Sequence, residues 1–257
     1  MKITKKKIGI IALIVGTILI ITTIVGCFIV IPKRLEEKER KRLVQEYYQN
    51  KLASYIVENE KYADFEVDVA FLGDSLTDGY DLKKYYPDYV TANRGIGGET
   101  TIGLEQRLQV SVYDLQPKVV VMLIGANNLD TMFDNYENIL LGLKENLPNS
   151  KVVLLSLTAM GQEWGKKNEL ACFNNVKIRL LAEKYDYTFI DLYTPLFDVT
   201  INEVYADYTT DGGHFTALGY EKVTAQIKPI LDAMLSKNDW HYVDGVPTAW
   251  IYTAPSA

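Results

Sequence analysis

A serine and a histidine that could act together in catalysis stand far apart in the sequence. Ser75 lies in Gly73-Asp74-Ser75-Leu76-Thr77-Asp78-Gly79, and His214 ends Asp211-Gly212-Gly213-His214. A serine hydroxyl becomes a nucleophile when a histidine accepts its proton, and a carboxylate can hold the imidazole in the tautomer that does so. The chain has only two histidines, and His214 is the one with an aspartate three residues before it. Ser75, His214 and Asp211 are therefore a candidate catalytic triad.

Both segments also have simpler interpretations. Aspartate and serine are favoured at turns and helix N-caps, so Ser75 could merely begin a helix. The segment does not form the G-x-S-x-G elbow of the α/β-hydrolases, because Thr77 stands where the second glycine is needed. A metal site at Asp211 and His214 is disfavoured, because no second histidine or thiolate cluster completes a coordination set.

Two further segments could donate hydrogen bonds to a developing negative oxygen. The glycines of Asn93-Arg94-Gly95-Ile96-Gly97-Gly98-Glu99-Thr100-Thr101 permit close backbone approach, which suits an N–H group aimed at an oxyanion. In Ile124-Gly125-Ala126-Asn127-Asn128 the side-chain amide of Asn127 could donate to the same oxygen. The alternatives are a phosphate loop, whose glycine motifs are not met, and an asparagine-rich turn that bonds its own backbone.

Alternating apolar segments must position these residues. Short apolar or β-branched runs indicate buried parallel strands, and the segments between them show helical spacing. Strands are expected at 67–72, 90–93, 119–124, 152–157 and 188–192, and helices around 136–147, 170–181 and 220–230. Pro229 should kink or shorten the last helix. The pattern predicts an α/β fold, a three-layer αβα sandwich of about five parallel strands, with the ligand site beyond their carboxyl ends.

The four segments that carry the candidate catalytic residues and oxyanion donors together resemble the sequence blocks of the SGNH/GDSL hydrolase family, over roughly residues 67 to 235. Gly73-Asp74-Ser75-Leu76 is similar to the first block, Gly98 to the glycine of the second, Asn127 to the asparagine of the third, and Asp211-x-x-His214 to the fifth. One position departs from the pattern. The third block usually reads Gly-x-Asn-Asp, whereas Asn128 follows Asn127 here.

This resemblance implies a flavodoxin-like fold and a serine esterase, a carboxylic ester hydrolase that needs neither metal nor cofactor. It makes Ser75 the nucleophile, His214 the general base and Asp211 the residue that orients the base. The backbone N–H groups of Ser75 and Gly98 and the amide of Asn127 would form the oxyanion hole. The expected substrate is an acyl or acetyl ester of a carbohydrate or lipid. Acyl transfer to a glycan and a catalytically weakened glycan-binding module remain alternatives.

The N-terminal region predicts a membrane anchor. After a basic tail at 1–7, residues 8–31 contain no charged side chain. At a rise of about 1.5 Å per residue a helix of this length spans roughly 36 Å, more than the ~30 Å of a bilayer core. A single-pass transmembrane signal anchor in the cell membrane is therefore expected. The rival interpretation is a lipoprotein signal, because Ile24-Val25-Gly26-Cys27 resembles a lipobox, but the apolar run continues past Cys27.

The remaining segments complete the expected organisation. A charged juxtamembrane helical stalk is expected at 32–62, the SGNH hydrolase domain at 63–237 and an aromatic C-terminal tail at 238–257. Basic residues flank the apolar run on both sides, but the signal-like order of basic tail and apolar run favours an extracellular catalytic domain.

Charge and cysteine usage restrict the partners. The net charge of -6 argues against nucleic acid or anionic lipid as the main partner of the globular part, and favours a small molecule or a polysaccharide or lipid ester. The two cysteines predict no structural disulfide, and the oligomeric state stays open.

Overall fold

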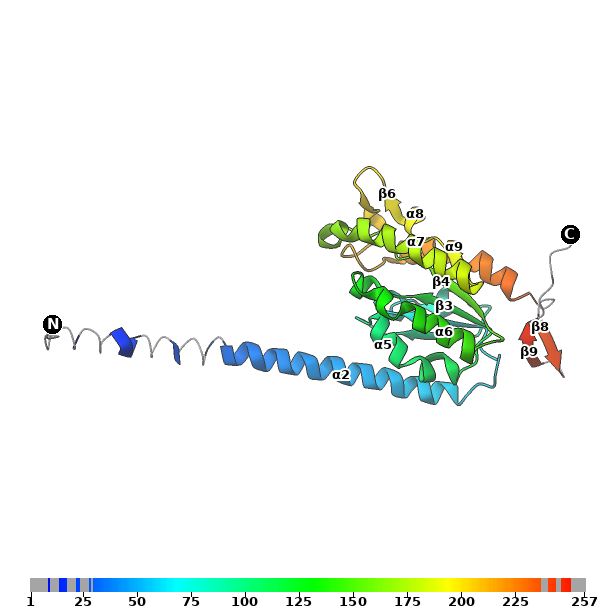
Figure 1. The fold of residues 1–257 in the computed structure, drawn as a ribbon, viewed down its shortest axis with the longest axis horizontal. Helices are drawn as coiled ribbons and strands as arrows, with labels where there is room; N and C mark the ends of the chain where they lie inside the picture. Colours follow the sequence, from blue (N-terminus) through cyan, green and yellow to red (C-terminus); the bar gives the residue numbers. More distant parts are fainter. Residues whose placement is uncertain are drawn as a thin grey trace. The chain divides into compact units, whose positions relative to one another are not determined.

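The computed structural model describes residues 30–236, the backbone of 240–243 and 246–250, and a few positions nearer the N-terminus, namely 9, 14–17, 22, 23 and 28. The chain divides into two compact units, residues 1–51 and 52–257. Figure 1 draws the ribbon, coloured along the sequence. No helix in the described part of the chain is long and apolar enough to cross a membrane. More than half of the residues in the anchor expected at 8–31 lie outside the described part of the chain.

The expected stalk is helical. Helix α2, Ile31–Asn59, begins in the first unit and ends in the second. Its exposed surface carries ion pairs one turn apart, such as Lys41 with Glu37 and Arg42 with Glu39. Such pairs each stabilise a helix by only ~0.2–0.5 kcal/mol, but their repetition favours a solvated helix.

The last turns of α2 belong to the second unit, which begins at Leu52. Tyr55 is buried and its hydroxyl donates to the Gly95 carbonyl at 2.7 Å. Asn59 is also buried and its side-chain amide donates to the Val110 carbonyl at 2.8 Å. Packing against the domain therefore starts before residue 63, where the sequence analysis placed the beginning of the domain. The sequence shows no sign of this, because these turns of α2 look as polar as the rest of the stalk.

A five-stranded parallel sheet forms the centre of the second unit, which confirms the predicted fold class. Its strand order is β2-β1-β3-β4-β5, an order found in flavodoxin-like folds. The strands are β1 Val69–Gly73, β2 Thr91–Gly95, β3 Val119–Leu123, β4 Lys151–Leu155 and β5 Thr188–Ile190. Every residue of β1 and β3 is buried, as expected of central strands covered on both faces.

Helices cover the two faces of the sheet (Figure 1). Val223 and Ile227 of the last long helix pack with Phe71, Val121 and Leu155, side chains on one face of the sheet. Successive side chains of a strand point to opposite faces. The neighbours of these residues along each strand therefore point to the other face, toward the helices α5, α6 and α7. These helices pack in sequence, α5 against α6 and α6 against α7. The helices of the domain are α3 Ser75–Asp78, α4 Leu82–Tyr85, α5 Thr101–Gln106, α6 Tyr136–Asn146, α7 Asn168–Tyr185, α8 Tyr193–Leu196 and α9 Ala217–Met234.

Pro229 was expected to kink or shorten the last helix, and it does not shorten it, because α9 continues past it to Met234. A proline removes one backbone hydrogen bond from a helix. Val223, Ile227 and Leu231 are nevertheless buried along one side of α9, on both sides of the proline. We infer that this burial keeps the helix continuous.

Two small antiparallel pairs complete the described backbone. Phe197–Asp198 (β6) pairs with Glu203–Val204 (β7) beside the site described below. Trp240–Val243 (β8) pairs with Val246–Trp250 (β9) within the expected aromatic tail.

Candidate active site

Ser75 lies where the chain turns from strand β1 into helix α3. Asp74 caps this short helix, and its carboxylate accepts a hydrogen bond from the Leu76 N–H at 3.0 Å. Gly73 makes the turn possible, because an added Cβ there would lie 2.3 Å from the Leu123 carbonyl oxygen. The backbone thus fixes Ser75 at the carboxyl edge of a central strand.

His214 lies in a tight loop before α9. The Asp211 carboxylate accepts hydrogen bonds from the N–H groups of Gly213 and His214 at 2.9 and 2.8 Å. Gly212 has a φ of +84°, and an added Cβ would lie 2.2 Å from the Gly161 carbonyl oxygen. A glycine is therefore required at this position for two separate reasons.

The fold brings the three candidate residues into one hydrogen-bonded chain. His214 Nε2 lies 3.1 Å from Ser75 Oγ across 139 residues of sequence, and His214 Nδ1 lies 2.7 Å from Asp211 Oδ2. The bond from His214, followed by the bonds from backbone N–H groups, lowers the pKa of Asp211 to about 2. An ionised Asp211 accepts a hydrogen bond from Nδ1–H, which keeps the ring proton on Nδ1 and leaves Nε2 free to accept the proton of Ser75.

The candidate oxyanion donors lie in the loops that follow β1, β2 and β3. Ser75 is the first residue of α3, so its N–H has no acceptor within that helix. Gly98 has a φ of +77° and is exposed in the loop after β2. The Asn127 amide lines the pocket with Ser75 and donates one hydrogen bond, at 2.9 Å, to the Glu99 carbonyl. An amide has two N–H groups, so the second can serve a ligand.

Asn128, the residue that departs from the family pattern, forms hydrogen bonds with Thr101. Its side-chain oxygen accepts from the Thr101 N–H at 3.2 Å, and its amide donates to the Thr101 hydroxyl at 2.9 Å. These bonds tie the loop after β3 to the first residue of α5. The replacement of the usual aspartate by Asn128 therefore does not affect the amide donor assigned to Asn127.

A small pocket of about 80 Å³ opens beside Ser75. Its lining includes three residues that sequence reasoning did not single out, Thr158, Met160 and Trp164, all from the loop after β4. The only signal for them was their place beyond the carboxyl end of a strand. The pocket is lined by Asp74, Ser75, Leu76, Ala126, Asn127, Thr158, Met160, Trp164, Gly213 and His214.

The loop after β4 is held firmly against the histidine loop. The Gly161 N–H donates to the Gly212 carbonyl at 2.8 Å. Buried Asn168 bonds both the N–H and the carbonyl of Met160 at 2.8 Å. The Trp164 ring rests on Gly213, and Lys167 Nζ lies 4.6 Å from the ring centroid on this loop. Trp164 therefore forms one wall of the pocket, with part of its surface exposed.

Asp74 is an unusual carboxyl group in this pocket. It is only 2 % exposed, and burial raises its pKa to about 6, against the lowering effect of the Leu76 N–H and of nearby His214. No set of three or more potential metal ligands occurs among the described residues.

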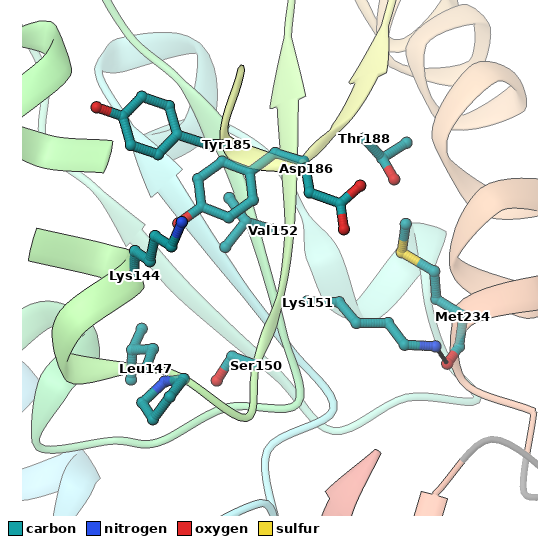
Figure 2. A pocket seen from close by; sticks show the side chains of 11 residues that line it. Lys144, Leu147, Ser150, Lys151, Val152, Tyr185, Asp186, Thr188 and Met234 are labelled. Atoms are coloured by element: carbon teal, nitrogen blue, oxygen red, sulfur yellow. Dashed lines mark hydrogen bonds between the residues drawn. The ribbon is translucent and has the colours of Figure 1, made fainter. Parts of the chain in front are cut away.

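A larger hollow of about 500 Å³ lies at the opposite ends of the strands from Ser75 (Figure 2). It is lined by Lys151 and Thr188, the first residues of β4 and β5, so it lies at the amino ends of the strands. In Figure 2 the Lys151 ammonium donates to the Met234 carbonyl, at 3.0 Å. The described residues that line this hollow include no histidine that could activate a serine, so the smaller pocket is the candidate active site.

Comparison with protein families gives a single assignment. Residues 71–222 match the model of the GDSL-like lipase/acylhydrolase family, an interval that contains all the candidate catalytic residues. No curated protein matches the chain.

Solved structures share the fold. A GDSL-like lipase from Bacteroides thetaiotaomicron is 26% identical with a TM-score of 0.62, and the match covers 72% of this chain and 98% of that one. A Streptococcus pneumoniae protein provisionally described as a platelet activating factor is 21% identical with a TM-score of 0.63, over 77% and 99% of the two chains. The acetylxylan esterase Axe2 from Geobacillus stearothermophilus is 19% identical with a TM-score of 0.54, over 65% and 95%.

Proposed function

Because the chain belongs to the GDSL-like lipase/acylhydrolase family and is an SGNH/GDSL-type esterase, we propose that it hydrolyses short acyl esters through an acyl-enzyme on Ser75. The observation that carries the proposal is the hydrogen-bonded chain from Ser75 Oγ through His214 to Asp211. A nucleophile, a base and an orienting carboxylate in this order are the parts that acyl transfer through serine requires.

The chemistry follows from this geometry. Ser75 Oγ attacks the ester carbonyl while His214 Nε2 accepts the hydroxyl proton. The tetrahedral intermediate collapses, and the alcohol leaves with the proton from His214. Water then attacks the acyl-enzyme, His214 again acts first as base and then as acid, and the carboxylic acid is released from Ser75.

The oxyanion hole stabilises both tetrahedral intermediates in this proposal. Negative charge forms on the former carbonyl oxygen, and fixed donors aimed at it lower the barrier because they need not reorganise. The N–H groups of Ser75 and Gly98 and the second N–H of Asn127 supply these donors. The bond from Asn127 to the Glu99 carbonyl supports this assignment, since it fixes the plane of the amide.

The dimensions of the site favour a short acyl group, such as acetyl, on a large alcohol. The pocket beside Ser75 holds about 80 Å³, far below the roughly 300–1,000 Å³ of pockets that enclose drug-sized ligands. Asp211 and His214 are about half exposed, with side-chain values of 51% and 54%, so the alcohol side is open. O-acetylated polysaccharide fits these two properties, and the structurally similar Axe2 is an acetylxylan esterase. A lipid ester with a short acyl chain fits as well.

We also propose that residues 8–31 anchor the enzyme in the cell membrane as a single-pass signal anchor, with the catalytic domain outside the cell. The support is the length of the uncharged run and the basic tail before it. Helix α2 would then be the spacer between membrane and domain. This arrangement suits an enzyme that acts on cell-surface esters.

Labelling with a fluorophosphonate tests the catalytic proposal. The full-length chain, purified in detergent, should form one adduct, located on Ser75 by mass spectrometry, and the Ser75→Ala variant should form none. A folded wild-type protein that stays unlabelled would favour the glycan-binding module instead.

A further inference from the structure

A buried arginine lies behind the candidate active site and bonds to the segments that form it. Arg107 is 2% exposed and follows helix α5 directly. Its Nη2 donates to the Gly73 carbonyl at 3.0 Å, two residues before Ser75. Its Nη1 donates to the Arg94 carbonyl at 3.0 Å and to the Ser111 hydroxyl at 2.9 Å. One rigid guanidinium thus joins the ends of β1 and β2.

The Nε of Arg107 donates to Glu99, which is itself 7% exposed. Arg107 Nε lies 2.9 Å from Glu99 Oε2, and Glu99 Oε1 accepts from the Thr100 N–H at 3.2 Å. Gly103 leaves room for this carboxylate, because an added Cβ there would lie 1.8 Å from Glu99 Oε1.

Glu99 connects this ion pair to two of the proposed oxyanion donors. Gly98 directly precedes Glu99, so a displacement of the Glu99 backbone would move the loop that carries the Gly98 N–H. The Glu99 carbonyl accepts the hydrogen bond that orients the Asn127 amide. The third donor is the N–H of Ser75. Ser75 lies two residues after Gly73, whose carbonyl accepts a hydrogen bond from Arg107.

We propose that Arg107 and Glu99 are positioning residues that hold the three oxyanion donors at one point. The proposal rests on the function proposed above. The three donors come from three separate loops, after β1, β2 and β3, and a misplacement of about 1 Å can cost roughly 10²-fold in rate. A buried, planar ion pair is a stiff connection, since neither group can be solvated by water if it moves. Arg107 and Glu99 themselves do not touch the substrate.

The first test compares kcat and KM of the full-length chain with p-nitrophenyl acetate. Glu99→Gln preserves the size of the side chain but removes the charge that pairs with Arg107. We expect kcat to fall about 10- to 100-fold with KM nearly unchanged, because the donors act on the transition state. Arg107→Lys should give a smaller loss of the same kind, because lysine retains the charge without the planar fork. A rise in KM with unchanged kcat in Glu99→Gln would overturn the proposal.

A double-mutant cycle tests whether Glu99 acts through the oxyanion hole. In an Asn127→Ala background, Glu99→Gln should lower kcat by a smaller factor than in the wild type, because one of the donors it positions is already gone. Equal factors in the two backgrounds would overturn the proposal even if each variant is slow.

Gly103→Ala perturbs the Glu99 carboxylate without removing any charge or hydrogen-bond donor. Its added methyl group should displace Glu99 and lower kcat, although alanine is the better helix former. A folded Gly103→Ala variant with wild-type kcat would count against the proposal. Glu58→Gln is the matched control, since Glu58 pairs with the neighbouring buried Arg94 and, among the described residues, its side chain forms no hydrogen bond or ion pair with the loops after β1, β2 and β3. It should lower stability and leave kcat unchanged, whereas a kcat loss equal to that of Glu99→Gln would show a general effect of buried ion pairs and overturn the inference.

The outcome can be separated from the fate of the proposed function. If Ser75→Ala retains activity, the serine mechanism itself fails. If Ser75→Ala is inactive but Glu99→Gln is as fast as the wild type, the serine mechanism stands and only the role of Arg107 and Glu99 is refuted.

Discussion

Ser75 and His214 depend on each other at the scale of single residues, because Nε2 of the histidine is the group that can accept the serine proton. Removing either should therefore abolish nearly the same rate. The double Ser75→Ala/His214→Ala variant should be scarcely slower than either single variant. Asp211→Ala should retain more activity, since Asp211 orients the imidazole without bonding the substrate. Measured kcat/KM values for p-nitrophenyl acetate check the four variants, and near-wild-type activity of His214→Ala would contradict the mechanism.

The two adjacent asparagines should respond differently to alanine. Asn127→Ala should lower kcat by about 10²–10³, because it removes an oxyanion donor, with little effect on stability. Asn128→Ala should leave most of the activity but lower the free energy of unfolding by about 1 kcal/mol, because Asn128 bonds the start of α5 at Thr101. Steady-state kinetics and urea denaturation measure the two effects. Equal losses of kcat at both positions would mean that the donor is misassigned.

Asp74 should make the stability of the domain depend on pH. Burial raises its pKa to about 6, so between pH 4 and 6 the folded protein holds a proton that the unfolded chain has lost. The stabilisation is full below the ordinary pKa of about 3.9 and is lost as the pH rises through 6, with a total of order 3 kcal/mol.

Asp74→Asn should remove this contribution while it retains the cap of α3. The difference in free energy of unfolding between wild type and variant, measured by urea denaturation at pH 4, 5, 6 and 7, should shift in favour of the variant as the pH rises. A difference that is constant across this range would show that Asp74 does not titrate there.

At the scale of elements, the parallel sheet assembles the site from distant pieces. The loops after β1, β2, β3 and β4 all emerge at the carboxyl ends of the strands, and those after β1, β3 and β4 bring Ser75, Asn127 and Trp164 to one pocket. The histidine loop is brought there by α9, which packs across one face of the sheet. The elements are thus the positioning device, and the loops carry the chemistry.

The loop after β4 should determine the length of the acyl chain that the enzyme accepts. Trp164 forms one wall of the pocket, so Trp164→Ala should enlarge the pocket. The ratio of kcat/KM for p-nitrophenyl butyrate to that for the acetate should then rise by about tenfold or more. Lys167→Ala, which removes only the cation over the ring, should change this ratio much less. An unchanged ratio in Trp164→Ala would show that the acyl group binds elsewhere.

At the scale of the whole molecule, α2 is both part of the proposed spacer and part of the domain. Its last turns supply Glu58 and Asn59, which bond the buried Arg94 guanidinium. A chain that begins at Leu52 should therefore fold and be soluble. A chain that begins at Asp64 should be less stable by several kcal/mol, since it leaves Arg94 without its carboxylate. Thermal unfolding of the two truncated chains compares them, and equal stability would show that α2 is dispensable.

The full-length chain should stay with membranes through high salt and alkaline washing if residues 8–31 form the proposed anchor. Fractionation of cells followed by detection of the intact chain checks this, and recovery in the soluble fraction would contradict it. A change in the size of the mature protein in Cys27→Ser would support the lipoprotein alternative.

The sequence by itself determined the fold class and the identity of the candidate residues. Its apolar runs are continuous because buried parallel strands have no polar face, and its glycines mark turns where a Cβ has no room, as at Gly73. The motifs around Ser75, Gly98, Asn127, Asp211 and His214, and their resemblance to the SGNH/GDSL blocks in the same order, were enough to name these candidates.

Only the tertiary structure decided what surrounds and supports them. The hydrogen bond between Ser75 and His214 joins positions 139 residues apart. The pocket wall at Trp164 and the links through Arg107 and Glu99 depend likewise on loops from different strands. The packing of Tyr55 on the domain was hidden in a segment that reads as a charged stalk, and α9 continued past Pro229. Local patterns report the propensity and burial of single segments, whereas these features arise from contacts between segments that local patterns do not encode.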